Sequence, residues 1–399
     1  MSKYLLFVHT DEFVELELAK KHKLDFLNQC EILYYADPSN YVSDTRKKIA
    51  IVNLSEEIYS YETVLPLSFD LSKADLVVVY SREDVFKNKE TVEREIFQSY
   101  NNKNICVLAG GIDYRTYSNE YFYPLLSHFK LTIEASDNSI THDINEKKFL
   151  FDCLLGTPKP SRKYIYYRLL EDKLLDSSLV SITVEQDYYQ TEHYNDLWPN
   201  ISHEYQSKYG VINGYKSDFL KSIDSRYQVE NLEKLDVNNP ANNLITAING
   251  IINDTDHGHS YWRRIYTTPH EVYNNTWYSI ITETYQNHRY QPTEKTAKAF
   301  LGQRIFVPFC CKHFLKNLKK LGFKTFSSII DESYDEVEDT VKRFDMAWQQ
   351  IRRLAQSDPK SVYNKVQDIL QHNRKIILDP YFQLKEIEEY IYNHANSIL

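Results

Sequence analysis

The residues best suited to chemistry in this sequence are Thr293, Glu294 and Lys295, which lie at the expected start of a helix. Apolar runs of strand length precede and follow this helix, and Gly302 is expected to end it. In such a strand-helix-strand unit the helix begins at the carboxyl edge of a parallel sheet, where its N–H groups and its dipole favour an anion. Lys295 adds a positive charge, and the Glu294 carboxylate can accept hydrogen bonds from neighbouring hydroxyls. We therefore predict a site for a ribose beside a pyrophosphate.

This helix start is followed by an apolar strand that contains Pro308 and by a Gly-Phe-x-x-Phe sequence from Gly322 to Phe326. A second segment lies upstream, where the apolar run 151–155 leads through Lys159 into a helix that begins near Arg162. In this order, the two segments resemble the donor-binding region of α-1,3-fucosyltransferase-like glycosyltransferases and of related phage-encoded glycosyltransferases. The resemblance covers roughly residues 149–343, with a gap in the middle.

The resemblance implies a role for each matching residue. Arg162 occupies the position of the arginine that binds diphosphate in that family, and Lys159 is a further candidate. A cation at a helix N-terminus is also unfavourable unless something negative lies there, which independently supports a bound phosphate. The family implies a GT-B architecture, in which two Rossmann-like domains face a cleft and the C-terminal helices cross back. Its activity is the transfer of a sugar from a nucleotide diphosphate sugar, UDP- or GDP-linked, to an acceptor hydroxyl, with inversion and without a metal.

Inverting transfer also needs a carboxylate that takes the proton of the acceptor hydroxyl. Fucosyltransferase-like enzymes carry a glutamate after a strand of the first domain, and Glu56 and Glu57 follow the third expected strand here. Asp113, after the fifth expected strand, is another candidate. Other acidic residues that follow strands are Asp11, Glu12 and Glu83.

A different chemistry is offered by Asp254-Thr255-Asp256. This D-x-D sequence is the one that GT-A glycosyltransferases use to hold a divalent cation on the diphosphate, and His257 and His259 flank it. The pattern is common by chance and lies in a polar region rather than after an early strand, so we expect no metal. Neither a glycine-rich dinucleotide loop, a Walker A sequence nor a G-x-S-x-G elbow occurs. The alternative from another class is a nucleotide-sugar binding protein without catalysis.

The acceptor is less well defined by the sequence. Related phage enzymes decorate hydroxymethylated DNA bases. The basic stretches 159–168 and 312–324, together with Arg263 and Arg264, could contact DNA phosphates, and tyrosines could stack on a flipped base. A net charge of -9 argues against indiscriminate polyanion binding. We therefore expect either hydroxymethylated pyrimidines in DNA or a glycan, protein or small-molecule acceptor.

Two α/β domains are needed to position these residues, and the sequence predicts both. Residues 1–147 alternate apolar strands with helical stretches, as in a Rossmann-like acceptor domain. Residues 148–358 repeat this pattern as a donor domain with a polar, tyrosine-rich insertion at 185–262, and residues 359–399 are expected to form C-terminal helices. The expected strands are Tyr4–His9, Cys30–Tyr35, Ile49–Leu54, Asp75–Tyr80, Ile105–Leu108, Phe149–Leu155, Leu179–Val184, Tyr278–Ile281 and Arg304–Phe309.

Composition agrees with this organisation. The length of 399 residues suits two domains, and 42% hydrophobic with 26% charged residues is ordinary globular composition. No apolar run is long enough to span a membrane, and the first residues lack the pattern of a signal peptide. We therefore expect a soluble protein in the cytoplasm, which is the host cytoplasm if a phage encodes it. The 5 cysteines form no C-x-x-C pair, so neither a disulfide framework nor a structural zinc site is predicted.

Overall fold

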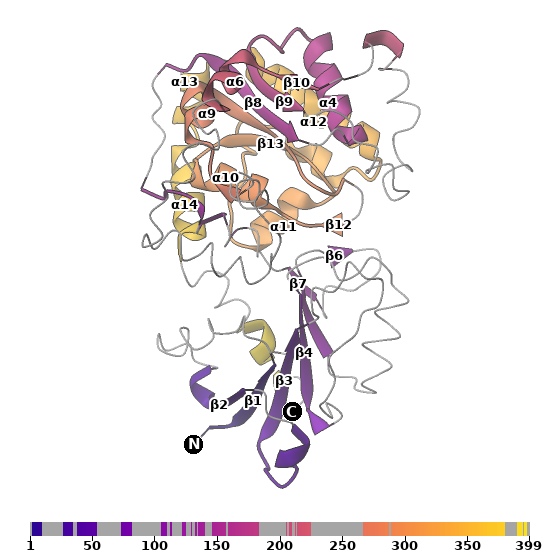
Figure 1. Cartoon of the computed structure of the whole chain (residues 1–399), viewed down its shortest axis with the longest axis vertical. Helices are drawn as coiled ribbons and strands as arrows, with labels where there is room; N and C mark the ends of the chain where they lie inside the picture. The colour runs from indigo at the N-terminus through magenta and orange to yellow at the C-terminus, as the bar shows by residue number, and fades with distance from the viewer. Residues whose placement is uncertain are drawn as a thin grey trace. The chain divides into compact units, whose positions relative to one another are not determined.

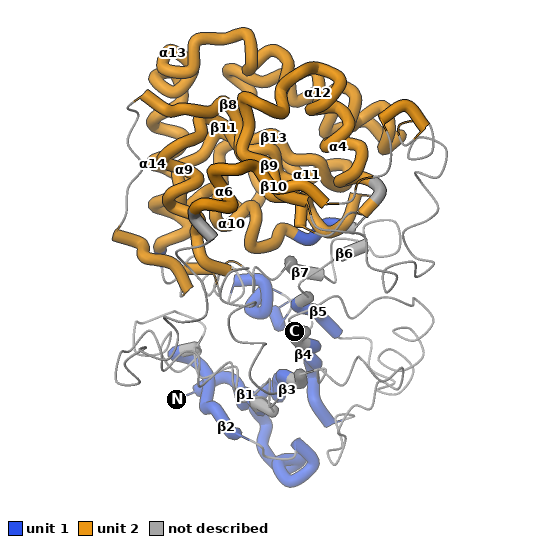
Figure 2. Tube along the Cα trace, turned by 45° about the horizontal axis from the view of Figure 1, so that its top comes forward, with its two compact units in different colours: residues 1–127, 288–291, 379–399 blue, residues 128–287, 292–378 orange. Residues whose placement is uncertain are grey.

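A computed structural model of the chain shows a mixed α/β protein built on largely parallel sheets (Figure 1). The structure describes residues 2–9, 27–34, 38–53, 73–81, 105–109, 112–113, 122–124, 129, 132–133, 135–139, 146–156, 159–182, 205, 207–209, 212, 214–224, 266–286, 289–379, 389–393 and 395–396. The chain divides into two compact units, coloured separately in Figure 2. Unit 1 contains residues 1–127, 288–291 and 379–399, and unit 2 contains residues 128–287 and 292–378.

Unit 1 is built on a parallel sheet with the strand order β2-β1-β3-β4-β5-β7. Its strands are β1 (Tyr4–His9), β2 (Cys30–Tyr34), β3 (Lys47–Asn53), β4 (Leu76–Ser81), β5 (Ile105–Ala109) and β7 (Phe122–Pro124). Adjacent residues such as Leu5 and Leu6, or Val77 and Val78, are all fully buried, so both faces of the sheet are covered. This is why the strands read as continuous apolar runs, and the predicted parallel sheet is confirmed here.

The end of the chain packs onto unit 1 rather than onto unit 2. Ile391 and Ala395 belong to the same buried cluster as Tyr4, Leu6 and residues of β2 to β5. The Tyr4 hydroxyl also donates a hydrogen bond to Asn396 Oδ1 at 3.2 Å. Ile391 and Ala395 therefore share the core of a domain whose first strand lies at the other end of the sequence.

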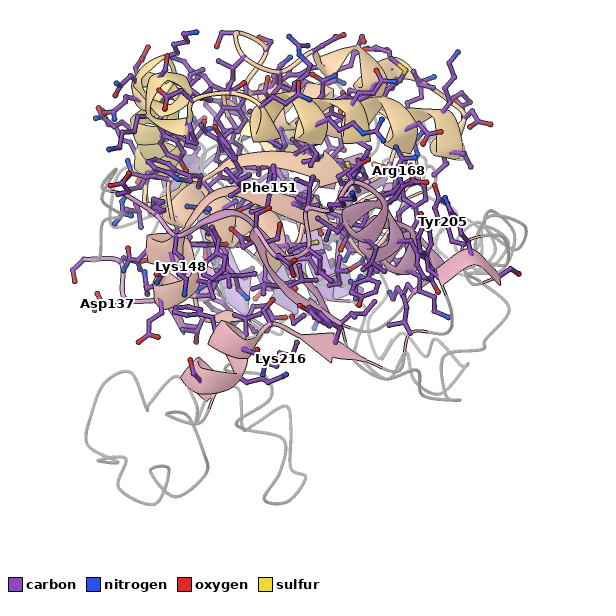
Figure 3. The ribbon with its side chains drawn as sticks, turned by 90° about the horizontal axis from the view of Figure 1, so that it is seen from above. Asp137, Lys148, Phe151, Arg168, Tyr205 and Lys216 are labelled. Carbon is purple, nitrogen blue, oxygen red and sulfur yellow. The ribbon has the colours of Figure 1, made fainter. Side chains whose placement is uncertain are left out.

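Unit 2 is built on a second sheet with the order β10-β9-β8-β11-β13. Its strands are β8 (Phe149–Gly156), β9 (Ser178–Ile182), β10 (Tyr215–Lys216), β11 (Thr276–Thr282) and β13 (Ile305–Phe309). All neighbours are parallel except β10, which pairs antiparallel with β9. Because β10 comes from the expected insertion at 185–262, part of that insertion extends the sheet. Figure 3 shows Phe151 of β8 in the interior of the unit and Asp137, Lys148 and Lys216 at its periphery.

Helices cover both faces of the unit 2 sheet. They are α4 (Pro160–Glu171), α6 (Asp218–Asp224), α9 (His270–Asn275), α10 (Glu294–Leu301), α11 (Phe314–Lys320), the short 3-10 helix η11 (Glu332–Glu336), α12 (Thr340–Ala355), α13 (Pro359–Asn364) and α14 (Gln367–Ile377). On one face, Phe300 of α10 packs against Phe306 at 5.5 Å between ring centroids. On the other face, Phe344 of α12 packs against Phe309 at 5.2 Å and against Tyr164 of α4 at 6.2 Å. Phe306 and Phe309 lie an odd number of positions apart on β13, so they point to opposite faces.

The limits of the two units differ from those of the expected domains. Residues 128–147 belong to unit 2, because Phe129 packs against Phe300 and Phe323 at 6.1 and 6.0 Å. Lys147 Nζ also donates a hydrogen bond to the Tyr273 carbonyl at 2.6 Å. Of the expected C-terminal helices, α13 and α14 belong to unit 2, and only residues from Asp379 onward belong to unit 1.

A buried ion pair fixes the central strands of unit 2. Arg304, 1% exposed, contacts the Asp152 carboxylate at 3.0 Å and donates to Ser279 Oγ at 3.1 Å and to the Thr276 carbonyl at 2.6 Å. Asp152 also accepts hydrogen bonds from the hydroxyls of Thr276 and Ser279. This network joins β8 and β11 to the residue that precedes β13. Within the described residues, no helix combines the length and apolar character needed to cross a membrane.

Candidate anion-binding site

The carboxyl ends of β8 and β11 form a topological switch point in unit 2. From β8 the chain passes through α4 to β9 on one side, and from β11 it passes through α10 to β13 on the other. Two neighbouring parallel strands thus send their connections in opposite directions. In open α/β sheets, ligands bind next to the carboxyl ends of such a strand pair.

The start of α4 combines a helix dipole with cationic side chains. Its N-cap residue, Lys159, makes no side-chain capping hydrogen bond, and its first turn contains no acidic residue. Arg162, only 6% exposed, lies in this turn, and the Lys159 carbonyl accepts from its N–H at 2.9 Å. Within the described part of the chain, the buried Ser161 Oγ has no hydrogen-bond partner. The dipole of the helix disfavours cations at its start and favours an anion there.

Gly156 allows the end of β8 to turn close to the Arg162 guanidinium. Its φ of +60° lies in the left-handed region that glycine adopts readily. A Cβ placed on Gly156 would lie 3.5 Å from Arg162 Nη1. The guanidinium therefore reaches back over the strand end rather than outward along the helix.

The start of α10 is organised around a buried carboxylate that the sequence analysis did not single out. Glu283, 1% exposed, follows β11 and accepts hydrogen bonds from the Thr293 N–H at 3.1 Å and from the Thr293 hydroxyl at 2.5 Å. It also accepts from the Thr296 hydroxyl at 2.5 Å. Thr293 is the N-cap, as predicted, and its Oγ1 accepts from the Lys295 N–H at 3.5 Å. The contacts of Thr293 therefore hold the helix start in place.

Lys295 projects from this helix start into a group of acidic side chains. Its Nζ lies 2.7 Å from Glu294 Oε1, 3.0 Å from Thr293 Oγ1 and 4.0 Å from Glu283 Oε2. The Lys295 side chain is 20% exposed and that of Glu294 12% exposed, so both remain within reach of a small ligand. One positive charge is thus held between two carboxylates at the end of β11.

The two predicted segments come together at this sheet edge. Burial and the neighbouring Arg162 and Lys295 cations lower the pKa of Lys159 to about 7, against the opposing effect of Glu294. Burial also lowers the pKa of Lys298, one turn along α10, to about 8. Residues more than 130 positions apart in the sequence, Lys159 and Lys295, therefore act on each other. The arrangement can hold a small anion such as a phosphate or diphosphate.

Several other predicted residues lie outside the described residues. These are Glu56, Glu57, Asp11, Glu12, Glu83, Asp254, Thr255, Asp256, His257, His259, Arg263 and Arg264. Asp113 lies in the short strand β6 (Ile112–Asp113), where it is the register partner of Arg289 in the antiparallel β12 (Arg289–Tyr290) of the same unit. Across the described ranges, no group of three His, Cys, Asp or Glu side chains is placed to hold a metal ion.

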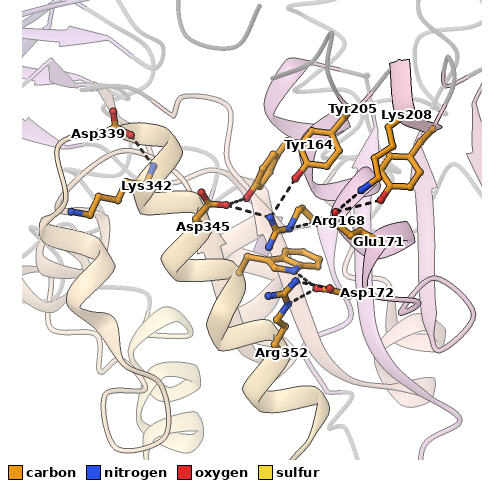
Figure 4. Close-up of polar contacts among 12 residues, drawn as sticks. Tyr164, Arg168, Glu171, Asp172, Tyr205, Lys208, Asp339, Lys342, Asp345 and Arg352 are labelled. Carbon is orange, nitrogen blue, oxygen red and sulfur yellow. Dashed lines mark hydrogen bonds and ion pairs between the residues drawn. The ribbon is translucent and has the colours of Figure 1, made fainter. Parts of the chain in front are cut away.

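Four cations in the basic stretches proposed for DNA contacts form ion pairs with acidic side chains. Arg168 of α4 lies 3.4 Å from the Asp345 carboxylate, 3.7 Å from Glu171 and 3.3 Å from the Tyr205 hydroxyl (Figure 4). Three lysines of the second stretch form ion pairs: Lys312 with Glu338, Lys316 with Glu336 and Lys319 with Glu332. These four cations are therefore already balanced by carboxylates of the protein.

Glu283 could have been found from the sequence by a rule already applied to the first domain. It directly follows an apolar strand, as the candidate bases Glu56 and Glu57 do.

No protein-family model matches this sequence, and no curated protein matches it. Function is therefore inferred from the residues and geometry of the site.

Proposed function

We propose that the protein is a glycosyltransferase that uses a nucleotide diphosphate sugar, UDP- or GDP-linked, as donor, and that unit 2 binds the donor diphosphate. The observation that carries the proposal is the meeting of Lys159, Arg162 and Lys295 at a sheet switch point, beside an α4 start without an acidic cap. Both units contain parallel Rossmann-like sheets, and residues 379–399 return to unit 1, as expected of a GT-B enzyme.

Each charged residue has a role in this proposal. Arg162 and Lys159 contact the diphosphate, and the dipole of α4 adds to their field. Lys295 contacts the same group from α10, while Glu294 accepts hydrogen bonds from the ribose hydroxyls. When the glycosidic bond to the donor breaks, the diphosphate leaves with negative charge, and these cations stabilise that charge without a metal. The base that deprotonates the acceptor is proposed among Glu56, Glu57 and Asp113.

Donor binding is the first test. A thermal-shift screen with UDP-, GDP-, CDP- and dTDP-linked sugars would find ligands that stabilise the native protein. Calorimetric titration of a hit should then show that Arg162→Ala weakens binding about 10- to 150-fold, the loss expected for one charge-assisted contact. Lys295→Ala should lose at least as much, because the Glu294 and Glu283 carboxylates then lack their shared cation.

Lys360→Ala is the matched control for these variants. Lys360 is exposed and lies on α13 of the same unit, and its removal changes the net charge equally. The affinity of the Lys360→Ala variant for the nucleotide sugar should match that of the wild type. Equal affinities for Arg162→Ala, Lys295→Ala and the wild type would refute the donor site.

Turnover separates an enzyme from a nucleotide-sugar binding protein without catalysis. Release of the nucleotide diphosphate from a bound donor should be measurable by coupled assay, slowly with water and faster with a suitable acceptor. The rate should survive excess chelator, and Asp254→Ala should leave it unchanged. Loss of the rate in chelator, recovered with manganese and abolished by Asp254→Ala, would favour metal-dependent GT-A chemistry instead.

A further inference from the structure

Ser161 is the second residue of α4, and its hydroxyl has no hydrogen-bond partner within the protein. The side chain is 1% exposed, so bulk water does not reach the hydroxyl. Of the buried serine and threonine hydroxyls in the described part of the chain, only Ser161 Oγ and Thr282 Oγ1 lack a partner. Thr282 is the last residue of β11, so both unpaired hydroxyls belong to elements that meet at the switch point of the sheet.

The position of Ser161 in the helix explains why its hydroxyl is unpaired. A serine inside a helix often donates to a carbonyl three or four positions earlier, as Ser222 does to the Phe219 carbonyl at 2.7 Å. No turn of α4 precedes Ser161, so the helix has no carbonyl in that place. The Lys159 carbonyl already accepts from two N–H groups, both at 2.9 Å, which uses both of its acceptor positions. The first turn of α4 therefore offers this hydroxyl no free acceptor.

The helix start that contains Ser161 is rich in donors. The first N–H groups of a helix have no partners within it, and the first turn of α4 has no acidic side chain. The Arg162 guanidinium reaches the end of β8, because a Cβ on Gly156 would lie 3.5 Å from its Nη1. Gly156 is exposed, so this strand end is open to a ligand. One ligand with several acceptor oxygens can satisfy N–H groups, guanidinium and hydroxyl together.

We propose that Ser161 donates a hydrogen bond to the diphosphate of the donor, an inference that rests on the donor site proposed above. The Cα–Cβ bonds of a helix tilt toward its N-terminus, so the Ser161 side chain leaves the backbone in the direction of the helix start. Serine has one rotatable side-chain bond, and a change between staggered rotamers turns Oγ from its buried position to a phosphate oxygen. The hydroxyl is then unpaired in the empty protein and paired in the complex.

This role predicts effects of opposite sign for Ser161→Ala. Alanine removes a buried hydroxyl that has no partner, so the ligand-free variant should unfold at the wild-type temperature or about 2–5 °C above it. Alanine also removes one hydrogen bond to a charged group, so the affinity for the diphosphate should fall about 10- to 150-fold. A serine with a purely structural role would instead lose stability and keep the affinity.

Ser178→Ala is the matched control. Ser178 is 2% exposed, and its hydroxyl donates to the Leu174 carbonyl at 2.7 Å. It begins β9, the strand that follows α4, so it lies at the opposite edge of the sheet, about 18 Å or one length of α4 from the helix start. The same substitution at this position should lower the unfolding midpoint and leave the affinity unchanged.

The experiment is calorimetric titration of the whole protein with two ligands. One is inorganic pyrophosphate, which contains the proposed anion and neither nucleoside nor sugar, and the other is the nucleotide sugar that stabilises the protein most in the panel. A thermal melt of each ligand-free variant, followed by tryptophan fluorescence, gives the unfolding midpoint. Ser161→Ala should weaken the binding of both ligands, and Ser178→Ala should bind both as the wild type does.

The outcomes separate this inference from the proposed function. Equal affinities of the wild type and Ser161→Ala for both ligands would overturn the role of Ser161 and leave the donor site intact. A lower midpoint for ligand-free Ser161→Ala would show that the hydroxyl already has a partner in the empty protein, which also overturns the inference. Pyrophosphate binding that depends on Ser161, without binding of any nucleotide sugar, would support the contact and overturn the proposed function. If neither ligand binds, both proposals fail.

Discussion

Replacing Glu283 with Gln tests the buried carboxylate that organises the start of α10. The substitution preserves the size of the side chain and removes its charge. Oε1 of Glu283 accepts from the Thr293 N–H and the Thr296 hydroxyl, and Oε2 accepts from the Thr293 hydroxyl. In the glutamine variant, the side-chain oxygen can take the place of Oε1 and accept the two hydrogen bonds made there. The side-chain NH₂ group then takes the place of Oε2 and faces Thr293 Oγ1.

That amide meets an atom whose acceptor positions are already used. Thr293 Oγ1 accepts from Lys295 Nζ at 3.0 Å and from the Lys295 N–H at 3.5 Å. One hydrogen bond is therefore lost, and two change from charge-assisted to neutral bonds at a cost of about 1 kcal/mol each. Together these changes should lower the free energy of unfolding of unit 2 by about 2–4 kcal/mol, which corresponds to a thermal unfolding midpoint about 5–15 °C lower.

Tryptophan fluorescence in urea is a suitable assay, because all 4 tryptophans of the sequence, at positions 198, 262, 277 and 348, belong to unit 2. The signal therefore reports the unfolding of this unit alone. Glu338→Gln is the matched control: its side chain is 77% exposed and pairs with Lys312, and such surface pairs contribute about 0–1 kcal/mol. Equal midpoints for Glu283→Gln and Glu338→Gln would refute the capping role of Glu283.

Further predictions concern the core, the strand end and the acceptor. Asp152→Asn should destabilise unit 2 by about 3–5 kcal/mol in the same assay, because it leaves the buried Arg304 without its carboxylate; a loss below 1 kcal/mol would contradict this. Gly156→Ala should cost about 1–2 kcal/mol through its left-handed backbone, yet change donor affinity little, since the added Cβ makes only an ordinary contact with Arg162. If hydroxymethylated DNA is the acceptor, gel-shift binding should fall steeply with salt, and Arg263→Ala with Arg264→Ala should weaken it for all sequences alike. No binding and no sugar transfer to hydroxymethylcytosine or unmodified duplexes would exclude DNA and leave a glycan, protein or small-molecule acceptor.

The longer strands of both units could be predicted closely from the sequence, whereas the three-residue β7 was not among the expected strands. A strand buried on both faces must be apolar at consecutive positions, and runs such as 4–9 and 105–108 differ from the observed strands by at most one residue. Two-residue β10 could not be predicted, because so short a strand forms only where β9 offers it an edge. The amphipathic pattern of residues 335–355 predicts one helix, but Asp339 caps α12 at Thr340, and the buried Asp335 instead accepts from the N–H groups of Leu315 and Lys316. That contact joins distant residues and leaves no periodic signal.

The candidate site was predictable in its local parts. Thr293 as N-cap and Gly302 as the end of α10 follow from the conformations those residue types favour, and both are observed. The sequence did not show that a carboxylate already accepts hydrogen bonds at the start of α10. This carboxylate belongs to Glu283, which lies ten positions before Thr293 and contacts it only in the folded chain. If Glu283 is left out of consideration, the start of α10 and the start of α4 are equally suited to bind an anion.

The two helix starts differ in whether the protein itself supplies a negative charge beside them. At α10, Glu283 already satisfies the N-cap, so this helix is a preformed support that presents Lys295 and Glu294. At α4, the described first turn has no acidic side chain, and its cations lie close to those of α10. In the proposed donor site, electrostatic repulsion among these cations at α4 is a cost that a bound diphosphate would remove. A ligand that removes it binds the folded unit alone, which is why donor affinity and the stability of unit 2 should rise together.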